Sequence, residues 1–218
     1  MDTSKKVVIV TGASRGLGEA IARQVAKMGG SLVLNARSAD KLEAVAEELR
    51  KMGADVVAVP GDVTDPSTAD KIIAQALGHY GKIDSLVNNS GIIEPIAPLS
   101  KADPEAWRAN LEVNLLSVVM LTQRAIPHLR ETNGTIISIS SGAATRVIPG
   151  WGHTAWQKLV SITSQLSSQS KNQRSQVSLS ARGSWIPVCR KKSGNLVVRA
   201  CLNPSMISLF NSMSRENY

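Results

Sequence analysis

A glycine-rich turn between an apolar run and an amphipathic segment is the feature that most constrains how this chain can fold. Residues 6–11 (KVVIVT) have the length and composition of a buried strand, GASRGLG follows at once, and the apolar residues of EAIARQVAKMG recur at helical spacing. Glycines at such a turn let a phosphate approach the backbone closely, and the next helix begins with free amide donors. Gly12, Gly16 and Gly18 therefore predict a site for a dinucleotide pyrophosphate, the alternative being a merely tight turn.

The first 150 residues continue this alternation of strand-like and helix-like segments. SLVLNA and DVVAVP have strand composition, and the segment between them, DKLEAVAEELRKM, has a helical period. The apolar face of that helix consists of Leu42, Val45, Ala46 and Leu49. Further along, the pattern predicts a helix around 69–77, a strand at IDSLVNN, a long helix over about 104–129 and a strand at GTIISIS. We therefore expect one α/β domain built on a doubly wound parallel sheet with right-handed crossovers.

The net charge of +8 lies entirely in the C-terminal part of the chain. Residues 1–150 hold 16 basic and 16 acidic side chains, whereas residues 151–218 hold nine basic and one acidic, so their difference of eight is the whole surplus. A basic tail can bind nucleic acid, but this serine-rich segment has no steady apolar period, and nucleic acid is not the expected partner. Cys189 and Cys201 form no CxxC pair, so no metal or redox centre is expected.

Neither a targeting segment nor a membrane span is evident. The first residues, MDTSKK, lack the apolar region of a signal peptide, and no apolar run approaches the roughly 20 residues needed to cross a bilayer. We therefore expect a cytoplasmic protein without a membrane partner.

The choice of nucleotide depends on the end of the second predicted strand. An acidic residue there would bind the ribose 2′-hydroxyl of NAD(H), and an arginine would accommodate the 2′-phosphate of NADP(H). The chain has Asn35, Ala36 and Arg37 at this point, and Arg15 lies in the glycine turn. Two guanidiniums could bind one phosphate in a bidentate manner. The sequence thus favours NADP(H), the alternative being that both arginines are solvated surface charges.

Four ordered motifs together resemble the short-chain dehydrogenase/reductase family: TGASRGLG at 11–18, GDV at 61–63, NNSG at 88–91 and ISISSG at 137–142. The resemblance covers about two thirds of the chain. It implies a Rossmann-like sheet, homo-oligomers, and hydride transfer between NADP(H) and a small-molecule carbonyl or alcohol. SGIIEP and PGWG further resemble the sepiapterin-reductase or benzil-reductase branch, which implies a diketone or pterin carbonyl as substrate. The implied cofactor contacts are Gly12, Ser14, Arg15, Gly16, Leu17, Gly18, Arg37, Asp62, Val63, Asn89 and Lys158.

The same resemblance implies a catalytic set of Asn, Ser, Tyr and Lys. Asn114 matches the asparagine that holds a water relay, with a helix-kinking or capping amide as the alternative. Ser141 matches the serine that hydrogen-bonds the substrate oxygen. Lys158 matches the lysine that binds the nicotinamide ribose and lowers the tyrosine pKa, with a surface lysine as the alternative.

The tyrosine is missing from the position where both spacings place it. Thirteen residues after Ser141 and four before Lys158, the chain has Thr154. A phenol with a pKa near 10 can be brought toward neutrality by an ammonium group and can then protonate an alkoxide. The threonine hydroxyl is a far weaker acid on a shorter arm. We therefore expect turnover to be lower by roughly 10²–10⁴-fold or more.

The segment that follows lacks the family's remaining elements. Neither a helix nor a buried strand ending in PGxxxT is predicted after Lys158, no sixth strand is evident, and composition and charge change abruptly near Gly152. Such a change indicates a shift of translation frame. Tryptophan has a single codon, TGG, so its third base is known and permits a check. Suppose that each intended codon starts at the third base of the printed one. Trp156 and Gln157 then encode alanine, and tyrosine and lysine are allowed at positions 154 and 158. The same offset lets ARGSWIPVC encode PGVVDTxM, whereas the other offset allows no tyrosine at 154.

We accordingly divide the chain at residue 158. Residues 1–158 are expected to form the NADP-binding domain with its catalytic residues, and residues 159–218 an aberrant basic tail, so that the C-terminal strands of the sheet are missing or disordered and homo-oligomer formation is doubtful. The intended activity is that of an NADPH-dependent carbonyl reductase, impaired in the chain as written. The alternative is a non-catalytic nucleotide-binding or interaction protein with a basic tail.

Overall fold

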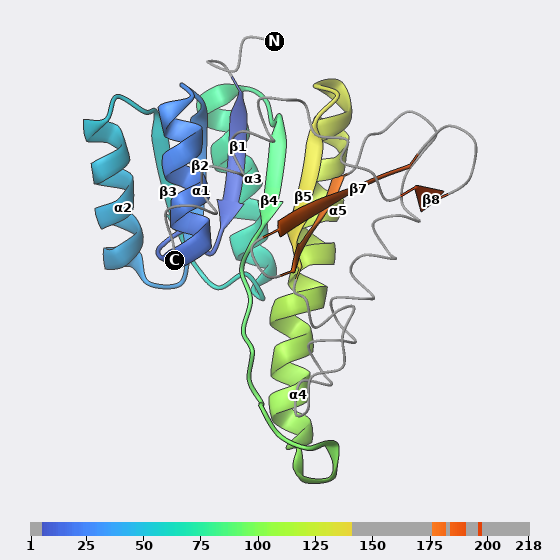
Figure 1. Ribbon diagram of the computed structural model, residues 1–218. Helices are drawn as coiled ribbons and strands as arrows, with labels where there is room; N and C mark the ends of the chain where they lie inside the picture. The colour runs from blue at the N-terminus through green and yellow to red at the C-terminus, as the bar shows by residue number, and fades with distance from the viewer. Residues whose placement is uncertain (1–5, 141–175, 182–183, 191–195, 198–218) are drawn as a thin grey trace.

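The computed structural model describes residues 6–140, 176–181, 184–190 and 196–197 (Figure 1). Its centre is a parallel sheet in the order β3-β2-β1-β4-β5. The order in which strands are added reverses at β1, since β2 and β3 lie on one side of it and β4 and β5 on the other. This confirms the predicted doubly wound, Rossmann-like parallel sheet. The five strands are β1 (Val7–Thr11), β2 (Ser31–Ala36), β3 (Val56–Pro60), β4 (Ser85–Asn88) and β5 (Thr135–Ile139).

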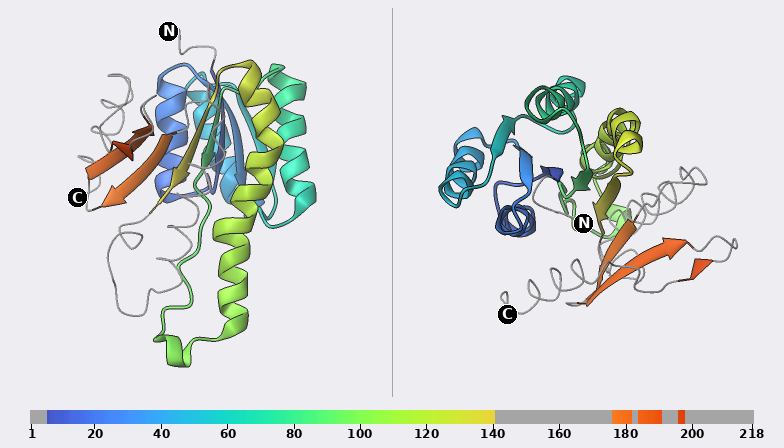
Figure 2. Two further views of the ribbon diagram at one scale, coloured as in Figure 1. Left: turned by 90° about the vertical axis from the view of Figure 1, so that its right-hand side faces the viewer. Right: turned by 90° about the horizontal axis from the view of Figure 1, so that it is seen from above.

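Helices cover both faces of the sheet, with α1 and α2 on one side and α3 and α5 on the other (Figure 2). Side chains alternate between the two faces along each strand: Val8 and Val10 of β1 pack in the α1/α2 layer, and Ile9 packs in the α3/α5 layer. The predicted apolar face of Leu42, Val45, Ala46 and Leu49 is buried in the α1/α2 layer, as expected. The helices are α1 (Gly16–Lys27), α2 (Ala39–Lys51), α3 (Pro66–Tyr80), α4 (Pro104–Leu111) and α5 (Ser117–Glu131).

The long helix expected over about 104–129 is interrupted. A π-helical turn, Glu112–Leu116, lies between α4 and α5. Together with the connection that precedes it, which contains a short 3-10 helix (Leu99–Lys101), α4 projects beyond the carboxyl edge of the sheet (Figure 1). π-Helical turns of this kind are frequent at functional sites, and this one adjoins the cavity described below.

Three further strands extend the sheet beyond β5, where the sequence predicts none. β6 (Gln176–Ala181) pairs parallel to β5, β7 (Ser184–Arg190) pairs antiparallel to β6, and β8 (Leu196–Val197) pairs antiparallel to β7. The reason for the difference lies in the residues of β6, QVSLSA, which alternate apolar and polar positions. A buried parallel strand is usually a continuous apolar run, and a two-residue alternation among serines is a weak signal.

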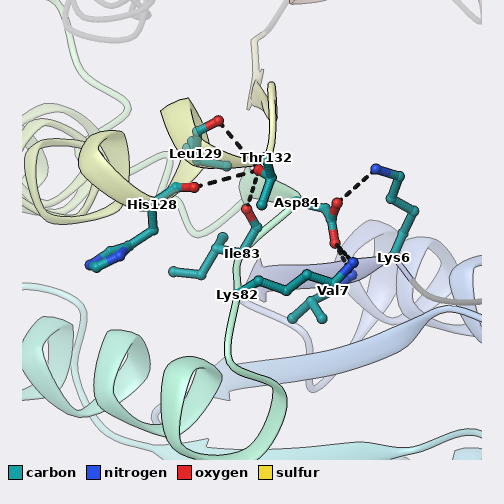
Figure 3. A network of polar contacts seen from close by, with 8 residues as sticks. All are labelled: Lys6, Val7, Lys82, Ile83, Asp84, His128, Leu129 and Thr132. Atoms are coloured by element: carbon teal, nitrogen blue, oxygen red, sulfur yellow. Dashed lines mark hydrogen bonds and ion pairs between the residues drawn. The ribbon is translucent and has the colours of Figure 1, made fainter.

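At the amino edge of the sheet, one buried carboxylate joins the starts of β1 and β4 (Figure 3). Asp84 accepts hydrogen bonds from Lys6 Nζ at 2.7 Å and from the Val7 N–H at 2.9 Å, and Lys82 Nζ lies 3.0 Å from it. Nearby, Thr132 Oγ1 donates to the Ile83 carbonyl at 2.7 Å and so fixes the end of α5 against the same edge. Within the described ranges, no helix is both long and apolar enough to cross a membrane.

Candidate nucleotide-binding site

A cavity of about 540 Å³ lies at the carboxyl edge of the sheet, where β1, β2 and β4 end. Its volume is typical of a small-molecule site, and the crevice at the strand reversal is where ligands bind in open α/β sheets. Eight of the residues predicted to contact a cofactor line it: Gly12, Ser14, Arg15, Gly16, Arg37, Asp62, Val63 and Asn89. Residues that the sequence predicts as cofactor contacts thus line one cavity, although they are far apart in the chain.

The glycine loop that begins this cavity has no room for side chains at two positions. Gly12 has φ +65°, and a Cβ added there would lie 2.9 Å from Asn89 Nδ2. A Cβ on Gly18 would lie only 2.3 Å from the Gly12 carbonyl oxygen, a backbone atom that cannot move aside freely. The loop therefore folds tightly onto the start of α1. Leu17 does not line the cavity; its side chain packs against the α1/α2 core layer.

Asn89 holds this loop in place. Its Nδ2 donates to the carbonyl oxygens of Thr11 at 2.9 Å and Gly12 at 3.2 Å. In return, Thr11 Oγ1 accepts from the backbone N–H groups of Asn89 and Ser90, both at 3.0 Å. These bonds lock the end of β1 to the end of β4. Asn89 thus serves the site by positioning the loop, a role that its place in the NNSG motif alone does not reveal.

The opposite end of the cavity is formed by the turn after β3. Asp62 Oδ1 accepts from the Thr64 N–H at 2.9 Å and from Thr64 Oγ1 at 2.8 Å, which orients the carboxylate beside Val63. Asn35, fully buried at the end of β2, donates to the carbonyl oxygens of Val59 and Gly61 at 2.9 and 3.1 Å. The side chain at the end of β2 thus positions the turn that carries Asp62.

The charged side chains of the cavity are mostly basic. Arg15 comes from the glycine loop, Arg37 from the connection between β2 and α2, and Lys41 from the first turn of α2, whereas Asp62 is the one acid among the described residues that line the cavity. In the described part of the chain, none of these three cations has an ion pair. Sequence analysis missed Lys41; its position four residues after Arg37, at the start of a helix, is the signal that could have identified it.

Asn114 lies next to the cavity in the π-helical turn and is almost fully buried. Its side chain binds both backbone polar groups of Ile92: Oδ1 accepts from the Ile92 N–H at 2.9 Å, and Nδ2 donates to the Ile92 carbonyl at 2.7 Å. Nδ2 also donates to Asn110 Oδ1 at 2.6 Å, and Asn110 Nδ2 donates to the carbonyls of Ile92 and Glu94. These contacts agree with the alternative that Asn114 is an amide at a helix irregularity. Asn110 was not predicted from the sequence.

The remaining predicted catalytic residues, Ser141, Thr154 and Lys158, lie outside the described residues. The strand that leads to Ser141 is β5, which ends at Ile139, and Ser140 beyond it is buried. β5 lies next to β4, and β4 leads directly to Asn89 of the cavity.

Comparison with known proteins agrees with this geometry. The profile of the short chain dehydrogenase family matches residues 6–176. An uncharacterized oxidoreductase of Schizosaccharomyces pombe is 40% identical over 150 residues, which are 69% of this chain and 59% of that protein. The chain spans about half the length of the curated relatives that it matches.

Solved structures with the same fold include complexes with both nicotinamide nucleotides. An alcohol dehydrogenase from Thermococcus sibiricus in complex with 5-hydroxy-NADP has a TM-score of 0.74 at 31% identity and covers 79% of this chain and 74% of its own. A short chain dehydrogenase/reductase from Burkholderia phymatum in complex with NAD has a TM-score of 0.75 at 28% identity and covers 82% and 66%. From its glycine loop, its parallel sheet and these matches, we conclude that the chain belongs to the short chain dehydrogenase family of oxidoreductases.

Proposed function

We propose that this chain binds NADP(H) in the cavity at the carboxyl edge of the sheet. The observation that carries the proposal is that Arg15 and Arg37, which come from separate elements, line one cavity with the glycine loop. Neither arginine has an ion pair in the described ranges, so both guanidiniums are available to a ligand. A phosphate on the 2′-oxygen of an adenosine ribose is the group that such a pair would bind.

The residues of the cavity fit the other parts of this nucleotide. The absence of side chains at Gly12, Gly16 and Gly18 permits the pyrophosphate to approach the backbone of the loop, beside Ser14 and the start of α1. Asp62 and Val63 would hold the adenine at the far end, and Asn89 would keep the loop in register. When bound, NADPH supplies a hydride from its nicotinamide to the carbon of a small-molecule carbonyl.

Calorimetric titration of the purified chain with NADPH and NADH tests the cofactor proposal. We expect NADPH to bind at least tenfold more tightly, because hydrogen bonds to a charged group contribute about 1.5–3 kcal/mol. The substitution Arg37→Gln should remove most of that difference without weakening NADH. Equal affinity for the two nucleotides would refute the preference for NADP(H), and absence of any binding by a folded chain would refute the site itself.

For catalysis, we propose the roles that the family resemblance implies. Ser141 would orient the substrate oxygen, Lys158 would bind the nicotinamide ribose, and Asn114 would support a proton path at the edge of the cavity. The contacts of Asn114 with Ile92 fix the backbone there in a single geometry. Thr154 would take the place of the phenol and could not donate a proton efficiently, so we expect NADPH binding with little turnover.

Low but measurable turnover distinguishes an impaired reductase from a purely nucleotide-binding protein. The assay follows NADPH oxidation with a diketone and with a pterin carbonyl as substrates. Rates within tenfold of an ordinary reductase would contradict the role assigned to position 154. Binding without turnover, together with salt-sensitive binding of a polyanion by the basic residues of 159–218, would favour a non-catalytic interaction protein.

We also propose that residues 1–158 are the functional part and that the sequence after them comes from a shifted reading frame. The support is the return of a Y-x-x-A-K pattern and of a P-G-x-x-x-T pattern under one and the same offset. Sequencing the coding DNA across codons 148–160 tests this directly. Stop codons that interrupt the alternative frame would contradict it.

A further inference from the structure

We propose that Lys41 is a third ligand of the ribose phosphate and contributes to the preference of the cavity for a phosphorylated adenosine, an inference that rests on the proposed binding of NADP(H). Lys41 is exposed in the first turn of α2 and lines the same cavity as Arg15 and Arg37. The three cations come from three successive parts of the chain: the glycine loop, the connection after β2, and the helix that follows it.

The acidic residues of α2 that form ion pairs do so with partners other than Lys41. Glu43 pairs with Arg50 on the same helix, and Glu48 pairs with Arg23 of α1. Asp40 is the immediate neighbour of Lys41 in sequence, and adjacent residues on a helix do not face each other. In the part of the chain that the structure describes, Lys41 has no ion pair. Its ammonium group is therefore available to an anion that enters the cavity.

The charge of the cavity favours such an anion. Among the described lining residues, three basic side chains stand against the single acid Asp62, which leaves two net positive charges (3 − 1). Asp62 Oδ1 already accepts two hydrogen bonds from Thr64. A phosphate monoester carries nearly two negative charges and three strong acceptor oxygens. Two guanidiniums leave acceptor positions unused on such a group. A lysine ammonium, a compact charge with three donors on a flexible stem, can occupy them.

The test uses ligands that report on the adenosine end alone. Adenosine 2′,5′-bisphosphate and adenosine 5′-monophosphate differ by the phosphate in question, and neither contains nicotinamide. In calorimetric titrations of the full chain at low salt, we expect Lys41→Gln to weaken the bisphosphate about tenfold, as expected for the loss of one charged hydrogen bond, and to leave the monophosphate unchanged. Lys41→Arg should retain most of the affinity.

The matched control is Lys51→Gln, which removes the same charge from the last turn of the same helix, outside the cavity lining. It should change neither affinity. If Lys51→Gln weakens the bisphosphate as much as Lys41→Gln does, a general field effect replaces direct contact and the proposal is wrong. If Arg37→Gln loses the bisphosphate and Lys41→Gln does not, NADP(H) binding stands and the role of Lys41 falls. If the unmodified chain binds both ligands equally, the preference for NADP(H) falls, and Lys41 with it.

Discussion

Replacing the buried carboxylate at the amino edge of the sheet should destabilise the whole fold. The side chain of Asp84 is 2% exposed and receives two lysine ammonium groups and the Val7 N–H (Figure 3). In the variant Asp84→Asn, the amide oxygen can still accept from Val7, but the charge that both lysines face is lost. The new amide hydrogens also point into a site that offers only donors.

The size of the effect can be estimated from the exposure of the partners. Hydrogen bonds to charged groups contribute about 1.5–3 kcal/mol when buried, whereas pairs on the surface contribute about 0.2–1 kcal/mol. Lys6 and Lys82 are 40% and 39% exposed, so each pair lies between these limits. Taking about 1 kcal/mol for each lysine gives a loss of about 2 kcal/mol. For a chain of this size, 1 kcal/mol lowers Tm by about 2–4 °C, so the expected decrease is about 4–8 °C.

Thermal unfolding followed by circular dichroism at pH 7 measures this loss. Lys6→Gln and Lys82→Gln are the companion variants, and each should cost about half as much as Asp84→Asn. Because both lysines share Asp84, the double variant leaves the buried carboxylate without a cation and should cost more than the sum of the two. A Tm of Asp84→Asn within about 1 °C of the unmodified chain would show that the carboxylate contributes nothing net. The reasoning from burial and charge would then be wrong.

Three further predictions concern the titration of Asp84, the glycine loop and the side chain of Asn110. Burial raises the pKa of Asp84, but the hydrogen bonds from Lys6, Val7 and Lys82 outweigh it and hold the pKa below the ordinary value of 3.8. The difference in stability between the unmodified chain and Asp84→Asn should therefore be constant above about pH 5 and close as the pH falls through the folded-state pKa. Urea midpoints across pH 3–7 would reveal this, and a difference that widens on acidification would contradict it. Gly18→Ala should abolish NADPH binding and destabilise the fold by about 1–3 kcal/mol, because its Cβ would lie 2.3 Å from the Gly12 carbonyl oxygen. The control is Gly78→Ala in α3, which has open space around it and should stabilise the fold by about 0.5–1 kcal/mol. Full NADPH binding by Gly18→Ala would refute the tight loop. Asn110→Ala should lower the free energy of unfolding by about 1–3 kcal/mol and speed hydrogen exchange at the Ile92 amide, because Asn114 loses the partner that orients its side chain. Unchanged exchange would mean that Asn114 binds Ile92 equally well without Asn110.

The sheet and the glycine loop could be predicted because they depend on local pattern. The apolar run before Gly12 and the helical period after it identify β1 and α1, and the face that begins with Leu42 gives the orientation of α2. The prediction joined α4 and α5 into one helix, because a π-helical turn adds no break to the apolar pattern that a periodicity analysis could detect. The π-helical turn becomes evident only in the backbone of the structure, where Asn114 within this turn binds Ile92.

What could not be predicted depends on distances between elements. Asn89 was expected to contact the cofactor, but its amide nitrogen also binds two carbonyls of the glycine loop, a contact that spans 77 and 78 residues of sequence. Lys41 belongs to no motif and lines the cavity only because α2 begins there. Asp84 likewise seemed an ordinary charge within IDSLVNN, although it is the residue that joins the starts of β1 and β4.

The arrangement of the chain makes nucleotide binding and turnover separable. The cavity is built from residues between Gly12 and Val113, and the carboxylate that secures its two central strands belongs to the same part of the chain. Apart from Asn114, the residues proposed for catalysis lie between Ser141 and Lys158. Under the proposed roles, threonine at position 154 would remove the acid and leave the described lining of the cavity in place. Affinity for adenosine 2′,5′-bisphosphate would consequently report on the proposed site even where turnover is absent, whereas loss of the site would abolish both binding and turnover.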